Sequence, residues 1–200
     1  MRFIVITGFL GSGKTTLLLG LVRGLMPFSP GRCVVLENEV GEIDIDGSYL
    51  AGQGLEVREL FAGCVCCQLA GSLVSTLNEI DSTLAPEAVW LEASGMADPR
   101  RLLATMERYY RVAEKTLVIS VADMERLEML LEAAEPMIRA QLEPADILVL
   151  NKADLASAEE LGRAASRIAL ISPDAELLNM SASRGTGMEQ LVEKVCRWWA

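Results

Sequence analysis

Apolar residues along the chain form short continuous runs, separated by longer segments in which they recur every three or four positions. The short runs are rich in valine, isoleucine and leucine, which is typical of strands buried on both faces of a parallel sheet. They predict strands at residues 3–7, 33–37, 56–60, 88–92, 116–121, 146–150 and 176–179. The wider spacing predicts helices at residues 14–25, 70–84, 99–108, 124–131, 135–142, 157–170 and 188–198.

The alternation of predicted strands and helices indicates the fold class. It is typical of α/β domains with a doubly wound, mostly parallel sheet and helices on both faces. A length of 200 residues suits one domain, so we assign residues 1–200 to a single domain. Ligands of such sheets bind beyond the carboxyl ends of the strands. The polar motifs of this chain follow predicted strands, and we therefore expect them to converge on one site.

The sequence GFLGSGKTT lies between the first predicted strand and the first predicted helix. It fits G-x-x-x-x-G-K-[ST], the phosphate-binding loop of P-loop NTPases, and it has the context that this motif requires. Backbone N–H groups of such a loop converge on phosphate, the lysine reaches the β- and γ-phosphates, and the Thr15 hydroxyl binds Mg²⁺. The predicted phosphate-binding residues are Gly8, Gly11, Ser12, Gly13, Lys14, Thr15 and Thr16. A glycine turn that only joins strand to helix is the alternative.

A second motif, N-K-x-D, follows the most apolar predicted strand. The Asp154 carboxylate can accept hydrogen bonds from both N1–H and the exocyclic amine of guanine. Asn151 can bond the other side of the base, and the Lys152 stem can cover its face. Main-chain donors at Ser181 and Ala182, after the last strand, are expected to back the base. Together with the phosphate loop, the motif predicts GTP as the nucleotide, and a polar turn is the alternative.

Glu92 ends the fourth predicted strand, and Gly95 follows it in the sequence E-A-S-G. An acid at this position can bind Mg²⁺ through water or orient an attacking water, and the Gly95 N–H can approach the γ-phosphate. A strand cap followed by a turn is the alternative. Because the chain contains no histidine, a Ser-His catalytic triad is excluded.

The charge and the composition narrow the partners and the compartment. A net charge of −10 argues against a nucleic-acid backbone or an anionic membrane surface as the main partner. No apolar stretch is long enough to span a bilayer. The first apolar run enters the glycine loop directly, unlike a signal peptide. We therefore expect a cytoplasmic protein, in which five cysteines do not form a disulfide framework.

Three of the five cysteines fall within four positions, Cys64, Cys66 and Cys67. Thiolates are soft ligands that suit zinc, copper(I) or iron–sulfur centres. Two of these thiolates with one carboxylate would leave an open coordination position, and the nearest candidate acids are Glu37, Glu39 and Glu42. Buried structural cysteines and a redox switch are the alternatives to this metal site.

Taken together and in this order, the motifs resemble the CobW-like family of P-loop GTPases. That family belongs with the GTPases that load nickel into urease and hydrogenase. Residues 37–46, ENEVGEIDID, look like its switch segment, and residues 63–67, GCVCC, match its G-C-x-C-C element. Residues 92–99 are similar to its E-x-S-G-x-A-D-P. The resemblance spans about three quarters of the chain, and the joint occurrence of these motifs is specific.

The resemblance implies a Mg²⁺-dependent GTP-hydrolysing switch that binds a transition metal, with zinc first and cobalt or nickel as options. The implied metal ligands are Cys66, Cys67, Glu37 and Glu42. Asp46 would be a switch residue near Mg²⁺, and Glu92 or Asp46 would place the attacking water while Lys14 stabilises phosphate charge. The implied partners are GTP or GDP and a client metalloprotein, and a homodimer is plausible for this class of switch.

The chain departs from the family pattern at several points. Val40 stands where the family usually has phenylalanine, and the histidine-rich tract common in metal chaperones is absent. The chain stops shortly after the predicted GTPase domain, so we expect no C-terminal domain of the family. Two other functions stay open. A small-molecule kinase with the same loop would prefer ATP, and a non-catalytic metal-binding adaptor would keep the nucleotide site only for structure.

Overall fold

The computed structural model describes residues 1–28, 33–37, 55–59, 68–95, 98–109 and 115–199, and it contains a seven-stranded sheet. Its strands are β1 (Arg2–Thr7), β2 (Cys33–Glu37), β3 (Leu55–Glu59), β4 (Ala88–Glu92), β5 (Lys115–Asp123), β6 (Ile147–Asn151) and β7 (Glu176–Asn179). Their order across the sheet is β3-β2-β4-β1-β5-β6-β7, and neighbouring strands pair in parallel throughout. The predicted α/β class and all predicted strands are confirmed.

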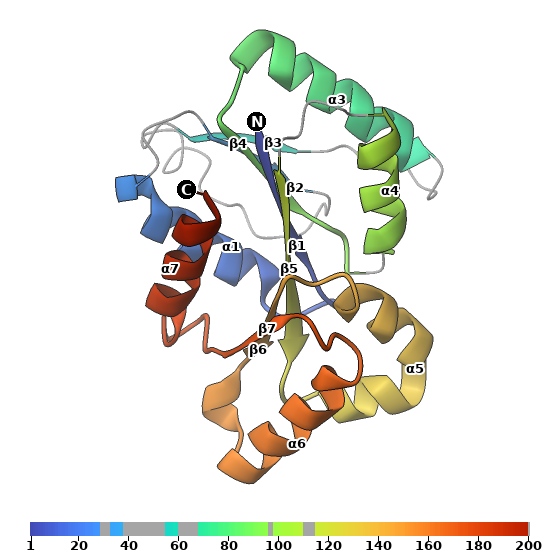
Figure 1. Ribbon diagram of the computed structural model, residues 1–200, viewed down its shortest axis with the longest axis vertical. Coiled ribbons are helices and arrows are strands. Elements are labelled where there is room, and N and C mark those ends of the chain that lie inside the picture. Colours follow the sequence, from blue (N-terminus) through green and yellow to red (C-terminus); the bar gives the residue numbers. More distant parts are fainter. Residues whose placement is uncertain (29–32, 38–54, 60–67, 96–97, 110–114, 200) are drawn as a thin grey trace.

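Helices cover both faces of this sheet, as the alternating pattern predicts (Figure 1). They are α1 (Lys14–Leu25), α3 (Gln68–Leu84), α4 (Pro99–Tyr109), α5 (Leu127–Leu142), α6 (Ala158–Ala169) and α7 (Met188–Trp199), with short 3-10 turns η1 (Met26–Phe28) and η2 (Ala153–Leu155). Helices α1 and α7 pack together on one face, and the other four helices lie on the opposite face. Within the described residues, no helix is both long and apolar enough to cross a membrane.

Alternate side chains of the central strand, β1, pack into hydrophobic clusters on opposite faces of the sheet. Ile4 and Ile6 are fully buried in the cluster that contains residues of α1 and α7. Phe3 is fully buried in the cluster that contains residues of α3 and α4. Successive side chains of a strand point to opposite faces, so a continuous apolar run is what a sheet covered on both sides requires.

Element α5 agrees with the prediction of two helices at 124–131 and 135–142. It consists of two helical segments that meet at a kink at Ala134, where φ is −149° and ψ is 40°. Pro136 lies just beyond the break, and proline lacks the N–H of the helical ladder and crowds the preceding turn. The predicted interruption between the two helices is therefore confirmed. The helix also begins three residues later than predicted, after a turn in which Arg126 N donates to Asp123 O at 3.2 Å.

The last helix is anchored to the sheet by aromatic contacts. Trp199 of α7 stacks on Trp90 of β4 with 6.2 Å between ring centroids. The Arg2 guanidinium lies 5.3 Å from the centroid of the Trp199 ring, and it also bonds Glu87 at 3.1 Å. These contacts hold α7 beside α1, on the face where the phosphate-loop helix packs.

The topology places two acidic residues on either side of the first glycine loop. Strand β1 lies between β4 and β5, and Gly8 follows directly after Thr7 at its carboxyl end. Glu92 ends β4 and pairs in register with Ile6, while Asp123 ends β5. The order reverses around β1, because β2 and β3 lie to one side and β5, β6 and β7 to the other. Such a switch point is where open α/β sheets bind ligands.

Candidate nucleotide-binding site

The loop between β1 and α1 has a backbone that only glycine tolerates at two positions. Gly8 has φ of +138°, and a Cβ there would lie 2.3 Å from the Val121 carbonyl oxygen. Gly13 has φ of +93°, and a Cβ there would lie 2.3 Å from Asn151 Nδ2. The glycines therefore let the loop turn tightly against β5 and β6. This is the compact geometry that the phosphate-loop motif predicts.

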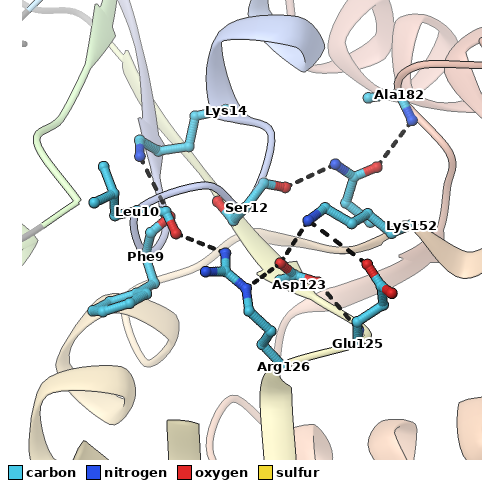
Figure 2. Close-up of polar contacts among 10 residues, drawn as sticks. Phe9, Leu10, Ser12, Lys14, Asp123, Glu125, Arg126, Lys152 and Ala182 are labelled. Carbon is cyan, nitrogen blue, oxygen red and sulfur yellow. Dashed lines mark hydrogen bonds and ion pairs between the residues drawn. The ribbon is translucent and has the colours of Figure 1, made fainter. Parts of the chain in front are cut away.

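Two side chains at the start of α1, Lys14 and Thr15, form contacts beside the glycine loop. Lys14 is buried, and its Nζ reaches back to the Phe9 carbonyl oxygen at 3.5 Å, across the loop (Figure 2). Thr15 Oγ1 donates a hydrogen bond of 2.8 Å to Glu92 Oε1. Hydroxyl and carboxylate oxygens are the hard donors that Mg²⁺ prefers. The pair therefore fits Mg²⁺, and it joins two residues that lie 77 positions apart.

The loop also buries a polar atom suited to an anion. Ser12 is fully buried, and its Oγ has no hydrogen-bond partner among the residues that the structure describes. A buried hydroxyl without a partner is costly, and a phosphate oxygen is an acceptor that it fits. The neighbouring Thr16 is exposed on α1, so its predicted contact with phosphate stays a prediction.

The segment after β4 lies against the phosphate loop. Glu92 is buried, and Ala93 N continues the ladder by donating to Ile6 O at 2.9 Å. A Cβ on Gly95 would lie 2.6 Å from Leu10 N, so the two backbones are in close contact. The fold thus brings Gly95 to the loop, as its predicted approach to the γ-phosphate requires. Its contact with phosphate stays a prediction.

The Asn151 side chain joins two loops of the site. Its Nδ2 donates to Ser12 O at 2.8 Å, and its Oδ1 accepts from Ala182 N at 2.9 Å. The buried amide therefore links the phosphate loop to the loop after β7, as expected of a buried polar group, which needs hydrogen-bond partners. The predicted contacts of Asn151 and of the Ala182 N–H with the base stay predictions.

Asp154, the predicted guanine-reading acid, lies at the start of the loop system after β6. Arg184 Nε forms an ion pair with Asp154 Oδ2 at 2.9 Å. A hydrogen bond from the Ser181 side chain, with a smaller contribution from the charge of Arg184, holds the pKa of Asp154 below its ordinary value. The carboxylate is therefore ionised and able to accept from guanine at neutral pH. The main-chain N–H of Ser181 donates to Thr186 O at 3.1 Å, and its predicted role as a base donor stays a prediction.

A buried carboxylate that the sequence reasoning missed lies at the centre of the site. Asp123 Oδ2 accepts hydrogen bonds from Arg126 Nε at 2.6 Å and from Lys152 Nζ at 2.7 Å (Figure 2). Arg126 Nη2 in turn donates to Leu10 O at 2.7 Å. A chain of contacts therefore connects the N-K-x-D motif, through Asp123 and Arg126, to the phosphate loop. The Lys152 ammonium is directed to Asp123, a role that the prediction for its stem did not include.

The ionisation of Asp123 is set by two opposing effects. Burial of the carboxyl disfavours its charged form, but the hydrogen bonds and charges of Lys152 and Arg126 outweigh burial. The pKa of Asp123 therefore lies below its ordinary value of 3.8. One signal in the sequence could have identified it, because an acid directly follows the apolar run of β5. No motif marks Arg126, whose role depends on the tertiary fold.

Only one candidate ligand of the predicted transition-metal site lies in the described part of the chain. Glu37 closes β2, and its Cα pairs in register with those of Glu92 and Glu59. The other candidate ligands, Glu39, Glu42, Cys64, Cys66 and Cys67, lie outside the described residues, as does Asp46, the predicted switch residue near Mg²⁺. Within the described ranges, no group of three cysteine or acidic residues is placed to hold a metal ion. The transition-metal site therefore stays a prediction.

Comparison with known proteins agrees with this geometry. A family model described as CobW/HypB/UreG, nucleotide-binding domain, matches residues 2–179. The zinc chaperone YeiR of Escherichia coli is 34% identical over 160 residues, which cover 79% of this chain and 48% of YeiR. The HypB hydrogenase maturation factor of Archaeoglobus fulgidus superposes with a TM-score of 0.71 at 17% identity, covering 100% of this chain and 91% of HypB.

A third similar protein is the Zn(II)-bound YjiA GTPase from E. coli, with a TM-score of 0.63 at 24% identity. That match covers 89% of this chain and 57% of YjiA. The chain spans about half the length of the curated relatives it matches. The two structural likenesses show the fold, and the family model covers the glycine loop, the segment after β4 and the N-K-x-D motif in one match. The chain therefore belongs to the CobW/HypB/UreG family of nucleotide-binding domains.

Proposed function

We propose that the chain is a single GTPase domain, residues 1–200, that binds Mg²⁺–GTP, hydrolyses it and couples the nucleotide state to a transition metal. The observation that carries the nucleotide part is the 2.8 Å contact between Thr15 and Glu92 beside the glycine loop. It joins a hydroxyl and a carboxylate next to Lys14, which is the set of groups needed to hold a metal–phosphate complex.

Each residue of the proposed reaction has a distinct task. Lys14 counters the negative charge that develops on the phosphate oxygens during transfer. The Thr15 hydroxyl would hold Mg²⁺, which would supply positive charge to neutralise the phosphate oxygens. Glu92 acts from β4, either on the Mg²⁺ hydration shell or by orienting the attacking water. Asp46 is the second candidate for positioning that water.

Base selection is assigned to Asp154. An ionised carboxylate can accept two hydrogen bonds from guanine, whereas the corresponding edge of adenine does not offer the same pair of donors. The Arg184 ion pair is largely exposed on the arginine side and contributes little to stability. Guanine can therefore replace it at small cost.

The proposed coupling to a transition metal begins at β2. Neighbouring strands lie about 4.8 Å apart, and the register places Glu37 directly beside Glu92. A metal that engages Glu37 would therefore act one strand away from the acid proposed for the GTP site. The cysteines at 64, 66 and 67 follow β3 in the chain, and the last residue of β3, Glu59, pairs with Glu37 on the other side.

Zinc is the first choice of metal, because thiolates favour it and because YeiR is named a zinc chaperone and YjiA binds Zn(II). Cobalt and nickel are the next candidates. A client metalloprotein is proposed as the partner, in line with the maturation role named for HypB. We further propose a cytoplasmic protein that does not depend on nucleic acid or membrane for its main contacts, and that forms a homodimer.

Measurement of phosphate release from GTP tests whether the protein is a GTPase. The purified protein with Mg²⁺–GTP should release phosphate, and Lys14→Ala and Thr15→Ala should lower kcat by about 100-fold or more. Thr105→Ala is the matched control, because Thr105 is only partly buried on α4 and its hydroxyl donates to Arg101 O of its own helix. Equal rates for the protein and Lys14→Ala, with or without zinc, would show that it is not a GTPase.

Competition between ATP and GTP for binding distinguishes the proposed GTPase from the main alternative, a small-molecule kinase. A small-molecule kinase should bind ATP in preference to GTP, and Asp154→Ala should leave that preference unchanged. The GTPase should bind GTP at least tenfold more tightly than ATP and lose that preference in Asp154→Ala. The third possibility, a metal-binding adaptor, requires metal affinity that is the same with GTP and GDP.

A further inference from the structure

The last turn of α5 carries a glutamine that contacts three parts of the proposed site. Gln141 is 1% exposed. Its main-chain carbonyl oxygen accepts hydrogen bonds from Thr7 Oγ1 at 3.1 Å and from Ser120 Oγ at 2.9 Å. Thr7 is the residue directly before the phosphate loop. The main chain of Gln141 is therefore fixed to the two strands below that loop.

The side chain of the same residue reaches the segment after β4. Gln141 Nε2 donates to the Gly95 carbonyl oxygen at 2.5 Å. Gly95 also lies against the phosphate loop, since a Cβ on it would be 2.6 Å from Leu10 N and 2.9 Å from Leu10 Cα. Gly95 is thus held between the loop on one side and the α5 amide on the other. A buried N–H donor without a partner is costly, so the bond from Nε2 fixes the position of the Gly95 carbonyl oxygen.

A second contact joins the same end of α5 to the residues beyond Gly95. Arg100 Nη1 lies 3.1 Å from Glu143 Oε2, and Arg100 N donates to Asp98 Oδ1 at 3.0 Å. These side chains are about half exposed and add little stability. They nevertheless place the start of α4 beside the turn of α5 that carries Gln141.

We propose that Gln141 is a positioning residue for GTP recognition and hydrolysis, acting through Gly95. By fixing the Gly95 carbonyl, it sets the position of this peptide relative to the phosphate loop before nucleotide binds. The inference rests on the proposed function, in which the Gly95 N–H approaches the γ-phosphate. GDP lacks that phosphate, so the bond should matter for GTP and much less for GDP.

A purely structural role for Gln141 predicts a different pattern. If the residue only held α5 in place, its loss would weaken GTP and GDP binding to the same extent. Loss of any other buried bond to the same turn should then have the same effect. Ser172 offers this comparison, because its buried hydroxyl donates to Leu142 O at 2.7 Å and is not bonded to Gly95.

The test compares Gln141→Met with Ser172→Ala in the full chain. Methionine keeps the length of the side chain but removes the donor to Gly95. We expect the ratio of affinities for a non-hydrolysable GTP analogue and GDP to fall about 3- to 10-fold in Gln141→Met. GDP affinity should stay within twofold, and kcat should fall more than KM rises. Ser172→Ala should keep the original ratio. A folded Gln141→Met protein with an unchanged ratio and kcat, or the same change in both variants, overturns the inference.

A second measurement needs no variant and covers the case in which Gln141→Met does not fold. Amide hydrogen exchange of residues 138–143 should slow when the GTP analogue replaces GDP, whereas exchange in α6 should not change. Equal exchange of residues 138–143 in both states overturns the role of Gln141. A protein that binds neither nucleotide contradicts the proposed function itself, so the two failures are distinguishable.

Discussion

Two buried acids lie on either side of the phosphate loop, and they differ in their partners. Glu92 ends β4 and accepts a hydrogen bond from the Thr15 hydroxyl. Asp123 ends β5 and accepts from two cations, Arg126 and Lys152. Both residues are at most 6% exposed, and both end strands that neighbour β1. The same type of group, at the carboxyl ends of two strands that neighbour β1, is therefore bonded to a predicted Mg²⁺ ligand in one case and to protein cations in the other.

The difference suggests two separate tasks for the two acids. Arg126 extends the Asp123 cluster to the Leu10 carbonyl, so this acid connects the base-binding motif to the loop through the protein alone. Glu92 is bonded to the residue that is expected to hold Mg²⁺, so its task depends on the nucleotide. We expect loss of Asp123 to act mainly on stability and loss of Glu92 mainly on activity.

The largest effect should come from Glu92→Gln. The amide keeps the shape of the side chain but cannot act as a base or carry the charge that Mg²⁺ and its waters favour. We expect kcat for GTP hydrolysis to fall by about 100-fold or more, with the midpoint of urea unfolding almost unchanged. Phosphate release and urea titration measure the two quantities. Glu132→Gln, at an exposed position on α5, is the control. Near-normal turnover in Glu92→Gln would contradict the proposal that Glu92 serves activity whereas Asp123 serves stability.

The next effect should be the loss of stability in Asp123→Asn. Removing one partner of a fully buried ion pair costs about 3–5 kcal/mol. Here Arg126 and Lys152 keep 35% and 31% side-chain exposure, so water compensates them in part. We therefore expect a decrease of about 2 kcal/mol in the free energy of unfolding, measured by urea titration. Asp174→Asn, at an exposed position, is the control. A decrease no larger than that of the control would mean that the ion pairs of Asp123 with Arg126 and Lys152 do not stabilise the fold.

A smaller effect is expected from Arg126→Gln. Lys152 still pairs with Asp123 in this variant, but the bond to Leu10 is lost. We expect a decrease of about 1 kcal/mol in stability and a fewfold loss of affinity for both GTP and GDP, because the whole loop is held less firmly. Nucleotide titration and urea unfolding test this. Arg163→Gln breaks only an exposed pair on α6 and serves as the reference. Loss of GTP affinity alone would instead assign Arg126 to the γ-phosphate.

The smallest effect concerns pH. The pKa of Asp123 in the folded protein lies below its ordinary value of 3.8. Its ion pairs therefore contribute fully above about pH 4, and the contribution is lost as the pH falls through the lowered value. Unfolding free energies of the protein and of Asp123→Asn should differ by a constant amount between pH 5 and 7 and converge below about pH 4. A difference that changes between pH 5 and 7 would contradict the assigned ionisation.

The sequence predicted the strands, the helices and the main polar motifs because each depends on local order. Continuous apolar runs predict strands in any parallel sheet, and the glycine loop carries its own backbone requirement at Gly8 and Gly13. The contacts of Asn151, Arg126 and Gln141 could not be predicted in this way. Each bonds a residue at least 46 positions away, so its role depends on the order of strands in the sheet.

The kink in α5 could be predicted from the sequence. The apolar spacing predicts two helices, and Pro136 lies just beyond the kink that separates them. The position of Glu37 shows the limit again, because it was one of three candidate acids in the sequence and only the strand register places it beside Glu92. The spacing of the cysteines and the lengths of the segments along the chain do not indicate which strands are neighbours in the sheet.

The central claim is that nucleotide state and metal affinity are linked, and one titration tests it most directly. Zinc affinity should be measured with a competing chelator in the presence of a non-hydrolysable GTP analogue and, separately, of GDP. We predict affinities that differ by at least tenfold between the two states, and a difference that disappears in Cys66→Ala and Cys67→Ala. Equal zinc affinity in the two states would contradict the account, because a ligand shifts an equilibrium only through differential binding.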